Sequence, residues 1–245
     1  MGWFGDSNQG YEFKLFSISH VVILAILLLV SIGIFLKRAK LKGEKWRFVE
    51  IGIALLLFII EGIYHVWLFV NGNWNVSIAL PLDLCSILLF LTVLLLLTHK
   101  RIFYELLFFA ALLGPTQAVI TPSLQYDFPH FRFLHFFFTH LMFIWVSLYF
   151  TWVKGFRPTF NSVIKLFVFL NILLPLIILI NNRVGGNYMF LSQKPNHPSL
   201  LDILGPYPWY IFSMEGLLIT LSIIVWLIFR EKGSVSRVMH KKRGG

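Results

Sequence analysis

One cysteine and two histidines are the most reactive combination in the chain. Cys85 is the only cysteine among 245 residues, which excludes an internal disulfide and a cysteine-based zinc cluster. It follows Pro81, a residue that suits the first position of a helix, so Cys85 would lie in the opening turns, where the helix dipole favours a thiolate. Histidine is the usual base for a cysteine nucleophile. His135 and His140 point about 140° apart on a helix, so either ring could face Cys85.

Such a pair suits acyl transfer. The thiolate would attack an ester carbonyl, and a second lipid alcohol or water would resolve the acyl-thioester. Asp83, Gln117 or Thr121 could orient the base or stabilise the oxyanion. This scheme uses no cofactor and no metal.

The composition of the chain places this chemistry in a membrane. Apolar residues make up 58% of the sequence and charged residues only 13%, with a mean hydropathy of +0.78. A soluble domain carries about 25% charged residues. A membrane helix needs about 20 mostly apolar residues, and the stretches that qualify are Ser17–Leu36, Phe48–Val70, Leu80–Leu97, Ile102–Ile120, Phe133–Val153, Phe160–Ile180 and Trp209–Phe229. We therefore predict an all-α polytopic membrane protein, a single bundle of seven transmembrane helices over residues 1–245.

Basic residues are concentrated at one end of the predicted bundle. The loops after the first, third and fifth spans, the start of the sixth span and the C-terminal segment hold 17 of the 21 Lys and Arg residues. The positive-inside rule then predicts the N-terminus outside and the C-terminus inside, with a basic cytoplasmic tail over residues 230–245. Topology and attraction to anionic lipid explain the net charge of +10, so we expect no nucleic-acid partner.

The other ionisable residues gather in the outer half of several spans. Ionisable groups are costly inside a bilayer, so each is a functional candidate. If these side chains faced lipid, they would have no hydrogen-bond partners. The helices should therefore bring them together around one water-containing cavity. The candidate substrate-binding residues are Glu61, His65, Gln117, Thr121, His130, Arg132, Asn187, Tyr188, Lys194, Asp202, Trp209 and Tyr210.

Several of these residues also have a purely structural interpretation. Glu61 and His65, four residues apart on one helix face, could form only a buried hydrogen-bonded pair. Arg132 could reach the lipid headgroups or neutralise Asp83. The aromatic residues near Trp209 fit an aromatic belt, and the Phe-rich run over residues 128–138 fits a lipid-facing or packing surface.

The predicted sixth loop, Asn181–Pro208, is long for a connection inside a compact fold. Its glycines and prolines favour a segment that folds over the outer cavity, and we predict an extracytoplasmic cap over residues 181–208. A flexible hairpin between the two spans is the alternative.

Several motifs together resemble one bacterial family of membrane proteins. They are LPLDLC at Leu80–Cys85, Gly114-Pro115 with Thr121-Pro122, FPHFRFLH at Phe128–His135 with His140, and the stretches at Gly186–Leu191 and Ser199–Tyr210. This combination resembles the YwaF-like integral membrane proteins, which are grouped with the animal transmembrane protein 164. The resemblance covers most of the chain. It implies a lipid acyltransferase of the bacterial cytoplasmic membrane that acts on phospholipids or lysophospholipids, with Cys85 as nucleophile and His140 as its histidine.

Two other classes of function fit the same residues. A zinc-dependent lipid hydrolase would take its ligands from Glu61, His65, Asp83, His135 and His140, although the sequence has no tight His-x-x-x-His pair. A non-enzymatic lipid transporter or sensor would use the acids and histidines as a proton relay. Alternating access, however, is expected to use a site at the membrane midplane, whereas these residues lie on one side.

Overall fold

The computed structural model describes residues 2–195 and 199–231, which are mainly helical. The helices are α1 (Ile18–Leu36), α2 (Arg47–Val70), α3 (Leu84–Thr98), α4 (Arg101–Ile120), α5 (Phe131–Trp152), α6 (Phe160–Val184) and α7 (Trp209–Phe229). Six of them are long and apolar enough to cross a membrane, and α3 is shorter, with 15 residues. The predicted all-α polytopic fold is confirmed. The predicted orientation of its ends stays a prediction.

The third helix begins later than predicted. The predicted span starts at Leu80, whereas α3 starts at Leu84, because Asp83 has an extended backbone with ψ of 151°. Pro81 therefore precedes the helix and does not occupy its first position. Cys85 nevertheless lies in the first turn, as its second residue.

The sixth helix ends later than predicted. α6 continues past Asn181 to Val184, and Gly185 follows it in the left-handed region, with φ of 66°. Glycine adopts this conformation without steric cost and commonly ends helices. The loop to α7 contains two short 3₁₀ segments, Tyr188–Phe190 and Leu200–Leu204.

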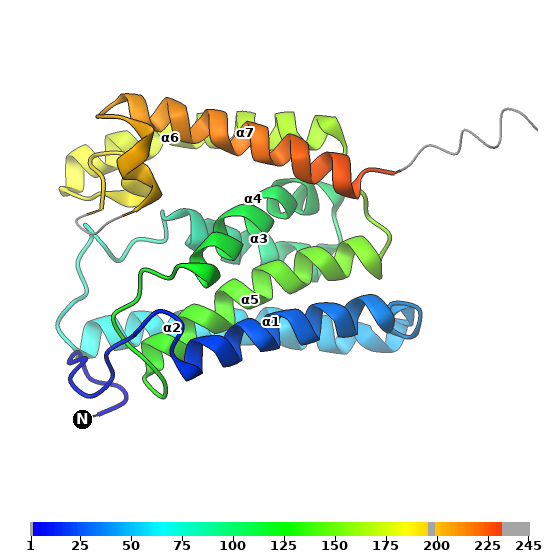
Figure 1. Ribbon diagram of the computed structural model, residues 1–245, viewed down its shortest axis with the longest axis horizontal. Helices are drawn as coiled ribbons and strands as arrows, with labels where there is room; N and C mark the ends of the chain where they lie inside the picture. The colour runs from blue at the N-terminus through cyan, green and yellow to red at the C-terminus, as the bar shows by residue number, and fades with distance from the viewer. Residues whose placement is uncertain (1, 196–198, 232–245) are drawn as a thin grey trace, which may run out of the picture.

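Helices α4 and α5 occupy the inside of the bundle (Figure 1). α3, α5, α6 and α7 all contact α4, while α1 and α2 contact α5. The most apolar windows of α4 and α5 are 56% and 67% buried, compared with 6% in α1 and 11% in α7. The exposed apolar faces of the outer helices are the surface that meets lipid in a membrane.

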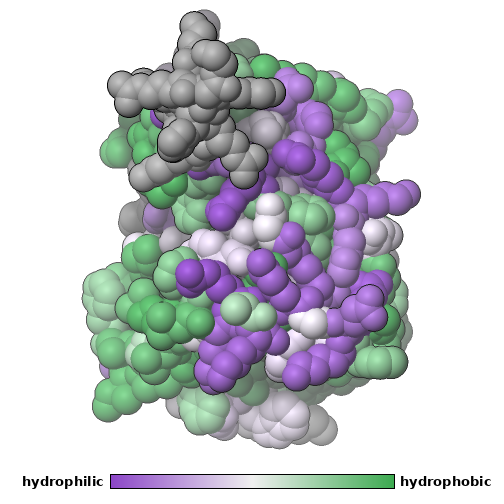
Figure 2. Space-filling view, turned by 90° about the vertical axis from the view of Figure 1, so that its right-hand side faces the viewer, coloured by the Kyte–Doolittle hydropathy of each residue, from purple (hydrophilic) through white to green (hydrophobic). Residues whose placement is uncertain are grey.

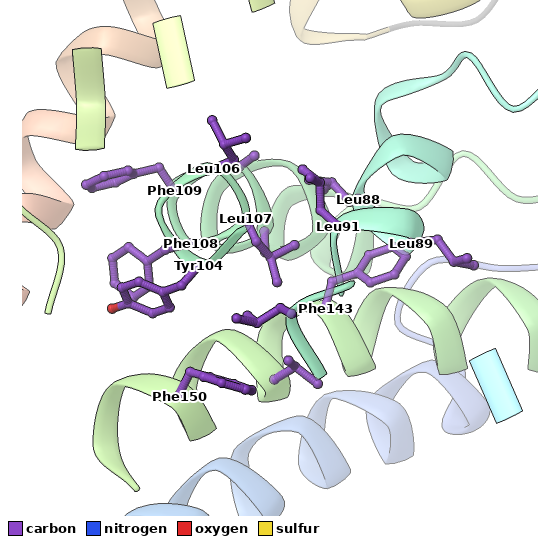
Figure 3. Close-up of a cluster of buried hydrophobic side chains, with 14 of the residues drawn as sticks. Leu88, Leu89, Leu91, Tyr104, Leu106, Leu107, Phe108, Phe109, Phe143 and Phe150 are labelled. Carbon is purple, nitrogen blue, oxygen red and sulfur yellow. The ribbon is translucent and has the colours of Figure 1, made fainter. Parts of the chain in front are cut away.

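The main core lies where α3, α4 and α5 meet (Figure 3). Leu95, Leu107, Phe108 and Phe150 are completely buried there. Lipid tails are as apolar as these side chains, so close packing holds such a core together, with little help from the hydrophobic effect.

The Phe-rich run at the start of α5 packs mainly inside the protein. Phe131, Phe133 and Phe137 are buried, and Phe133 and Phe137 belong to a core shared with α1. Of the two predicted roles of this run, packing inside the protein is therefore correct for these three residues. They do not face lipid.

The N-terminal segment is folded against the start of α5. The Trp3 carbonyl accepts a hydrogen bond from the Phe131 N–H (2.8 Å), and the Gly5 carbonyl accepts one from Nε2 of His130 (3.0 Å). The His130 ring is buried and stacks on Tyr126, with centroids 4.1 Å apart. These contacts fix the first turn of the helix that carries His135 and His140.

Candidate functional site

A cavity of about 690 Å³ lies among α2, α3, α4 and α5 on one side and α6, α7 and the loop between them on the other. Cys85 lines it. The other polar or ionisable residues in its wall include Glu61, Tyr64, Asp83, Ser86, Gln117, Arg132, His135, Thr139, His140 and Glu215. All four predicted catalytic residues are thus placed around one space, together with Glu61, Gln117 and Arg132 from the predicted substrate-binding set.

The far wall of this cavity is mainly apolar, and Glu215 of α7 is its ionisable residue. α6 contributes Leu170 and Leu174, and α7 contributes Ile211, Leu218 and Leu221. Most of the ionisable groups thus lie on the side formed by α2 to α5, and mainly hydrocarbon lies on the side formed by α6 and α7. The polar residues of the wall could be predicted from the sequence, but these leucines could not. Every span is rich in leucine, so the sequence does not show which leucines line a cavity.

Cys85 lies at the N-terminal end of α3. Asp83 occupies the N-cap position, but its side chain makes no capping hydrogen bond to the helix. Instead, Oδ1 of Asp83 accepts a hydrogen bond from the Met189 N–H of the sixth loop (3.0 Å). The first N–H groups of α3 therefore have no cap from Asp83, and this helix end favours negative charge.

His140 is held in one orientation by its own helix. Its ring stacks on Phe136, with centroids 4.2 Å apart, and its Nδ1 lies 2.7 Å from the Phe136 carbonyl oxygen. A carbonyl oxygen only accepts hydrogen bonds, so the proton is on Nδ1 and the lone pair is on Nε2. A neutral imidazole with a lone pair on Nε2 has the form of a general base.

His135 has partners at both ring nitrogens. Its Nδ1 lies 3.1 Å from Nη1 of Arg132, which can only donate, and its Nε2 lies 3.1 Å from Oε2 of Glu61. Nδ1 therefore accepts and Nε2 donates. Both nitrogens of His135 are occupied, whereas only Nδ1 of His140 has a hydrogen-bond partner among the described residues.

Tyr64 completes this polar network. Its ring stacks on His135 with centroids 4.6 Å apart, and the Arg132 guanidinium lies 4.3 Å from its centroid. Tyr64 was not among the predicted site residues, although it follows Glu61 by three residues and so shares its helix face. Arg132 points to this network rather than to Asp83.

Glu61 pairs more closely with His135 than with His65. The Glu61–His65 distance is 4.0 Å, compared with 3.1 Å to His135. His65 does not line the cavity. The spacing in the sequence identified a same-face pair but not the partner on another helix.

Several predicted substrate-binding residues lie outside the cavity lining and stay predictions. They are His65, Thr121, His130, Asn187, Tyr188, Lys194, Asp202, Trp209 and Tyr210. The Thr121 hydroxyl accepts a hydrogen bond from the Gln117 amide (2.6 Å). Trp209 is 65% exposed.

Other residues of this set organise the sixth loop. Oδ1 of Asn187 accepts hydrogen bonds from the N–H groups of Ser192 and Gln193, and the Asp202 carboxylate accepts one from the Ser199 N–H. Nζ of Lys194 lies 5.6 Å from the centroid of the Tyr210 ring. The Tyr210 hydroxyl donates to the Phe190 carbonyl. These contacts hold the loop in shape.

The sixth loop lies over the cavity. Met189, Phe190 and Leu191 line it, and Tyr188 ties the loop to the segment that precedes Cys85. The Tyr188 hydroxyl donates to the Val76 carbonyl (2.7 Å) and accepts from the Leu80 N–H (2.9 Å). Residues 196–198 of the predicted cap and residues 232–245 of the predicted tail lie outside the described residues.

The ligand set of the alternative function, a zinc hydrolase, is not assembled among the described residues. Within residues 2–195 and 199–231, no three His, Cys, Asp or Glu side chains are placed to hold one metal ion. His135 and Glu61 are committed to each other, and Asp83 holds the sixth loop.

A family model described as the TMEM164 family matches residues 15–226. The match includes α1 to α6, most of α7 and every residue of the cavity wall. The curated proteins and the solved structures give no match to the chain. Because this family model covers most of the chain, the chain belongs to the TMEM164 family.

Proposed function

We propose that this protein is a membrane lipid acyltransferase or transacylase that uses Cys85 as nucleophile and His140 as general base. One observation carries the proposal. The amphipathic cavity has in its wall both the chain's one thiol and a histidine whose Nδ1 is fixed by a backbone carbonyl, which leaves Nε2 as the basic nitrogen. Membership of the TMEM164 family fits the proposal.

In the first half of the reaction, Nε2 of His140 takes the proton from the Cys85 thiol. The thiolate attacks the ester carbonyl carbon of a phospholipid, and a carbon–sulfur bond forms. As the tetrahedral intermediate collapses, the carbon–oxygen bond of the ester breaks. The imidazolium returns its proton to the departing alkoxide, which leaves as the hydroxyl of a lysophospholipid.

In the second half, the hydroxyl of another lysophospholipid, or water, attacks the thioester. His140 removes the proton of the attacking hydroxyl, and the carbon–sulfur bond breaks. The Cys85 thiolate then recovers the proton from His140. No electrons are exchanged with an outside donor, and the net result is transfer or hydrolysis of one acyl group.

The N-terminal end of α3 would stabilise the oxyanion. The first N–H groups of a helix have no partner within the helix, and here Asp83 does not cap them. Cys85 is the second residue of that helix, so these donors lie beside the attacking sulfur. Removal of one oxyanion donor typically costs about 10²–10³ in rate.

The shape of the cavity suits a phospholipid or lysophospholipid. The acyl chain would lie along the leucines of α6 and α7, and the polar part of the lipid would lie toward Arg132. The reaction needs no cofactor. In a bacterial cell, the predicted topology would place the cavity in the outer leaflet of the cytoplasmic membrane.

The test uses the purified full-length protein in lipid nanodiscs with a phospholipid donor and a lysophospholipid acceptor that carries a label. Cys85→Ala should abolish transfer. His140→Asn keeps a side-chain N–H for the Phe136 carbonyl but has no base, so it should lower the rate by about 10²–10⁴. His99→Asn, at a histidine at the other end of α3 and outside the cavity lining, is the control and should keep most of the activity.

A labelled acyl group should also remain on wild-type protein in the absence of acceptor, and hydroxylamine should release it. Full transfer activity in Cys85→Ala would overturn the proposal. Proton-gradient-driven lipid flux by the same variant would point instead to the transporter class.

A further inference from the structure

A second cavity, of about 580 Å³, lies at the opposite end of α3 from Cys85. Lys42, Lys45, Arg47, His99 and Lys154 line it, with Glu44 and Phe48 beside them. They come from the α1–α2 loop, the start of α2, the end of α3 and the α5–α6 loop. Small-molecule sites typically have volumes of about 300–1,000 Å³, so this space is large enough for a ligand.

This end of the bundle is strongly hydrophilic. Figure 2 looks onto it and shows hydrophilic residues gathered in the middle and on the right of the face, with hydrophobic residues on its left. Basic residues of the α1–α2 loop contribute to it, and they belong to the end that the sequence predicts to be cytoplasmic. The pocket therefore lies at the polar surface of the membrane.

A buried carboxylate organises the pocket from below. Glu50 is 3% exposed, and its oxygens lie 2.7 Å from Nζ of Lys154, 2.6 Å from Nε2 of His99 and 3.1 Å from Nη1 of Arg47. The Tyr149 hydroxyl donates to the same carboxylate (2.6 Å). One negative charge thus holds two cations and a histidine in place.

Both terminal nitrogens of Arg47 are bound by the protein. Besides Glu50, it donates hydrogen bonds to the carbonyls of Leu96 (2.5 Å) and Leu97 (2.5 Å) at the end of α3. Its role is to hold the wall of the pocket. Lys154 is likewise paired with Glu50, so the groups left for a ligand are the ammonium groups of Lys42 and Lys45.

Lys42 and Lys45 supply positive charge that the pocket does not neutralise. Both are exposed, and neither forms an ion pair with a described residue. The pocket and its floor carry four cations, from three lysines and Arg47, but only the carboxylates of Glu44 and Glu50. The excess of two positive charges favours binding of an anion.

We propose that this pocket binds a phosphate group, supplied by the headgroup of an anionic phospholipid or by a soluble phosphate compound. A phosphate monoester carries a charge of about −1.5 to −2 at neutral pH and has three strong acceptor oxygens. Lys42 and Lys45 match this excess of charge, since each ammonium offers three donors. Phe48 lines the pocket and is 82% exposed, so it offers an apolar contact for the rest of a lipid.

The test measures binding to the full-length protein in detergent by native mass spectrometry. The probes are dioleoyl phosphatidic acid, dioleoyl phosphatidylcholine and inorganic phosphate. Lys42→Gln/Lys45→Gln should weaken binding of phosphatidic acid roughly 30-fold, since each lysine near an anionic lipid contributes about 1 kcal/mol. Glu44→Gln should strengthen it.

Lys37→Gln/Lys40→Gln is the matched control, because it removes the same charge from the same loop outside the pocket lining. It should leave binding within about twofold of wild type. Displacement of phosphatidic acid by millimolar inorganic phosphate would identify a soluble phosphate as a competent ligand, and no displacement would identify the lipid headgroup. Equal weakening in both double variants, or equal binding of phosphatidylcholine, would overturn the proposal.

Discussion

The hydroxyl of Tyr188 provides a sharp test of how the sixth loop is held over the cavity. Tyr188→Phe removes only one oxygen atom from a side chain that is 2% exposed. That oxygen donates to the Val76 carbonyl and accepts from the Leu80 N–H. The variant therefore removes one hydrogen bond from each of two backbone groups in the segment that leads to Cys85.

The expected cost follows from these two contacts. Leaving a buried donor or acceptor unsatisfied costs about 1–3 kcal/mol. Both backbone groups are only partly buried, so we expect a total loss of about 2 kcal/mol in the free energy of unfolding. For a chain of this length, 2 kcal/mol corresponds to a fall of about 4–8 °C in the midpoint of thermal unfolding.

The single cysteine makes opening of the loop measurable. A maleimide can label only Cys85, and its rate reports how often the cavity is open. A loss of 2 kcal/mol that acts wholly on loop opening raises that rate by up to about 30-fold. Tyr207→Phe is the control, because Tyr207 lies in the same loop and is 58% exposed. An unchanged labelling rate and an unchanged midpoint in Tyr188→Phe would refute this account of the loop.

Three further variants test other parts of the structure. Burial lowers the pKa of His130. Its neutral form therefore stabilises the fold above the ordinary pKa of about 6.5, and this contribution is lost as the pH falls. The midpoint of thermal unfolding should drop between pH 7 and 5, and it should drop less in His130→Gln. Gly186→Ala should also lower the midpoint, since its Cβ would lie 2.9 Å from a backbone oxygen of the α2–α3 loop, whereas Gly216→Ala on α7 meets nothing within 4 Å and should not. Glu50→Gln leaves a cluster of cations without its carboxylate and should cost about 3 kcal/mol by thermal unfolding, whereas the exposed Glu44→Gln should cost less than about 0.5 kcal/mol.

The helices could be predicted closely because the membrane restricts the choice of structure. A segment in lipid must satisfy its backbone internally, so a long apolar run is a helix. The predicted and observed bounds of α7 are identical, and those of α2 differ by one residue, at Arg47. The prediction failed at Leu80, where an apolar run continues but the backbone turns before Leu84.

The assignment of the histidines could not be made from the sequence. The partner of Nδ1 in His140 is four residues away on the same helix, so local geometry suffices to describe it. His135, however, is occupied by Glu61, 74 residues earlier and on another helix. Only the packing of α2 against α5 shows which ring has a nitrogen left for chemistry.

The shape of the sixth loop was also beyond local inference. Met189 and Phe190 both have positive φ, at 56° and 54°, which neither residue type favours. The tertiary contacts of Tyr188 and Asp83 maintain these conformations. No local sequence signal specifies such a backbone.

The apolar wall formed by α6 and α7 has a kinetic consequence. Exposed residues such as Ile172 and Leu176 of α6 and Ile224 of α7 face the hydrocarbon of the bilayer, while Leu174 and Leu218 of the same helices face the cavity. In the proposed reaction, a lipid substrate would reach Cys85 from within the membrane plane, so its mole fraction among the lipids, and not its concentration in water, would govern occupancy. Diluting the substrate with inert lipid should therefore slow turnover, even when the amount of substrate per volume of sample is unchanged.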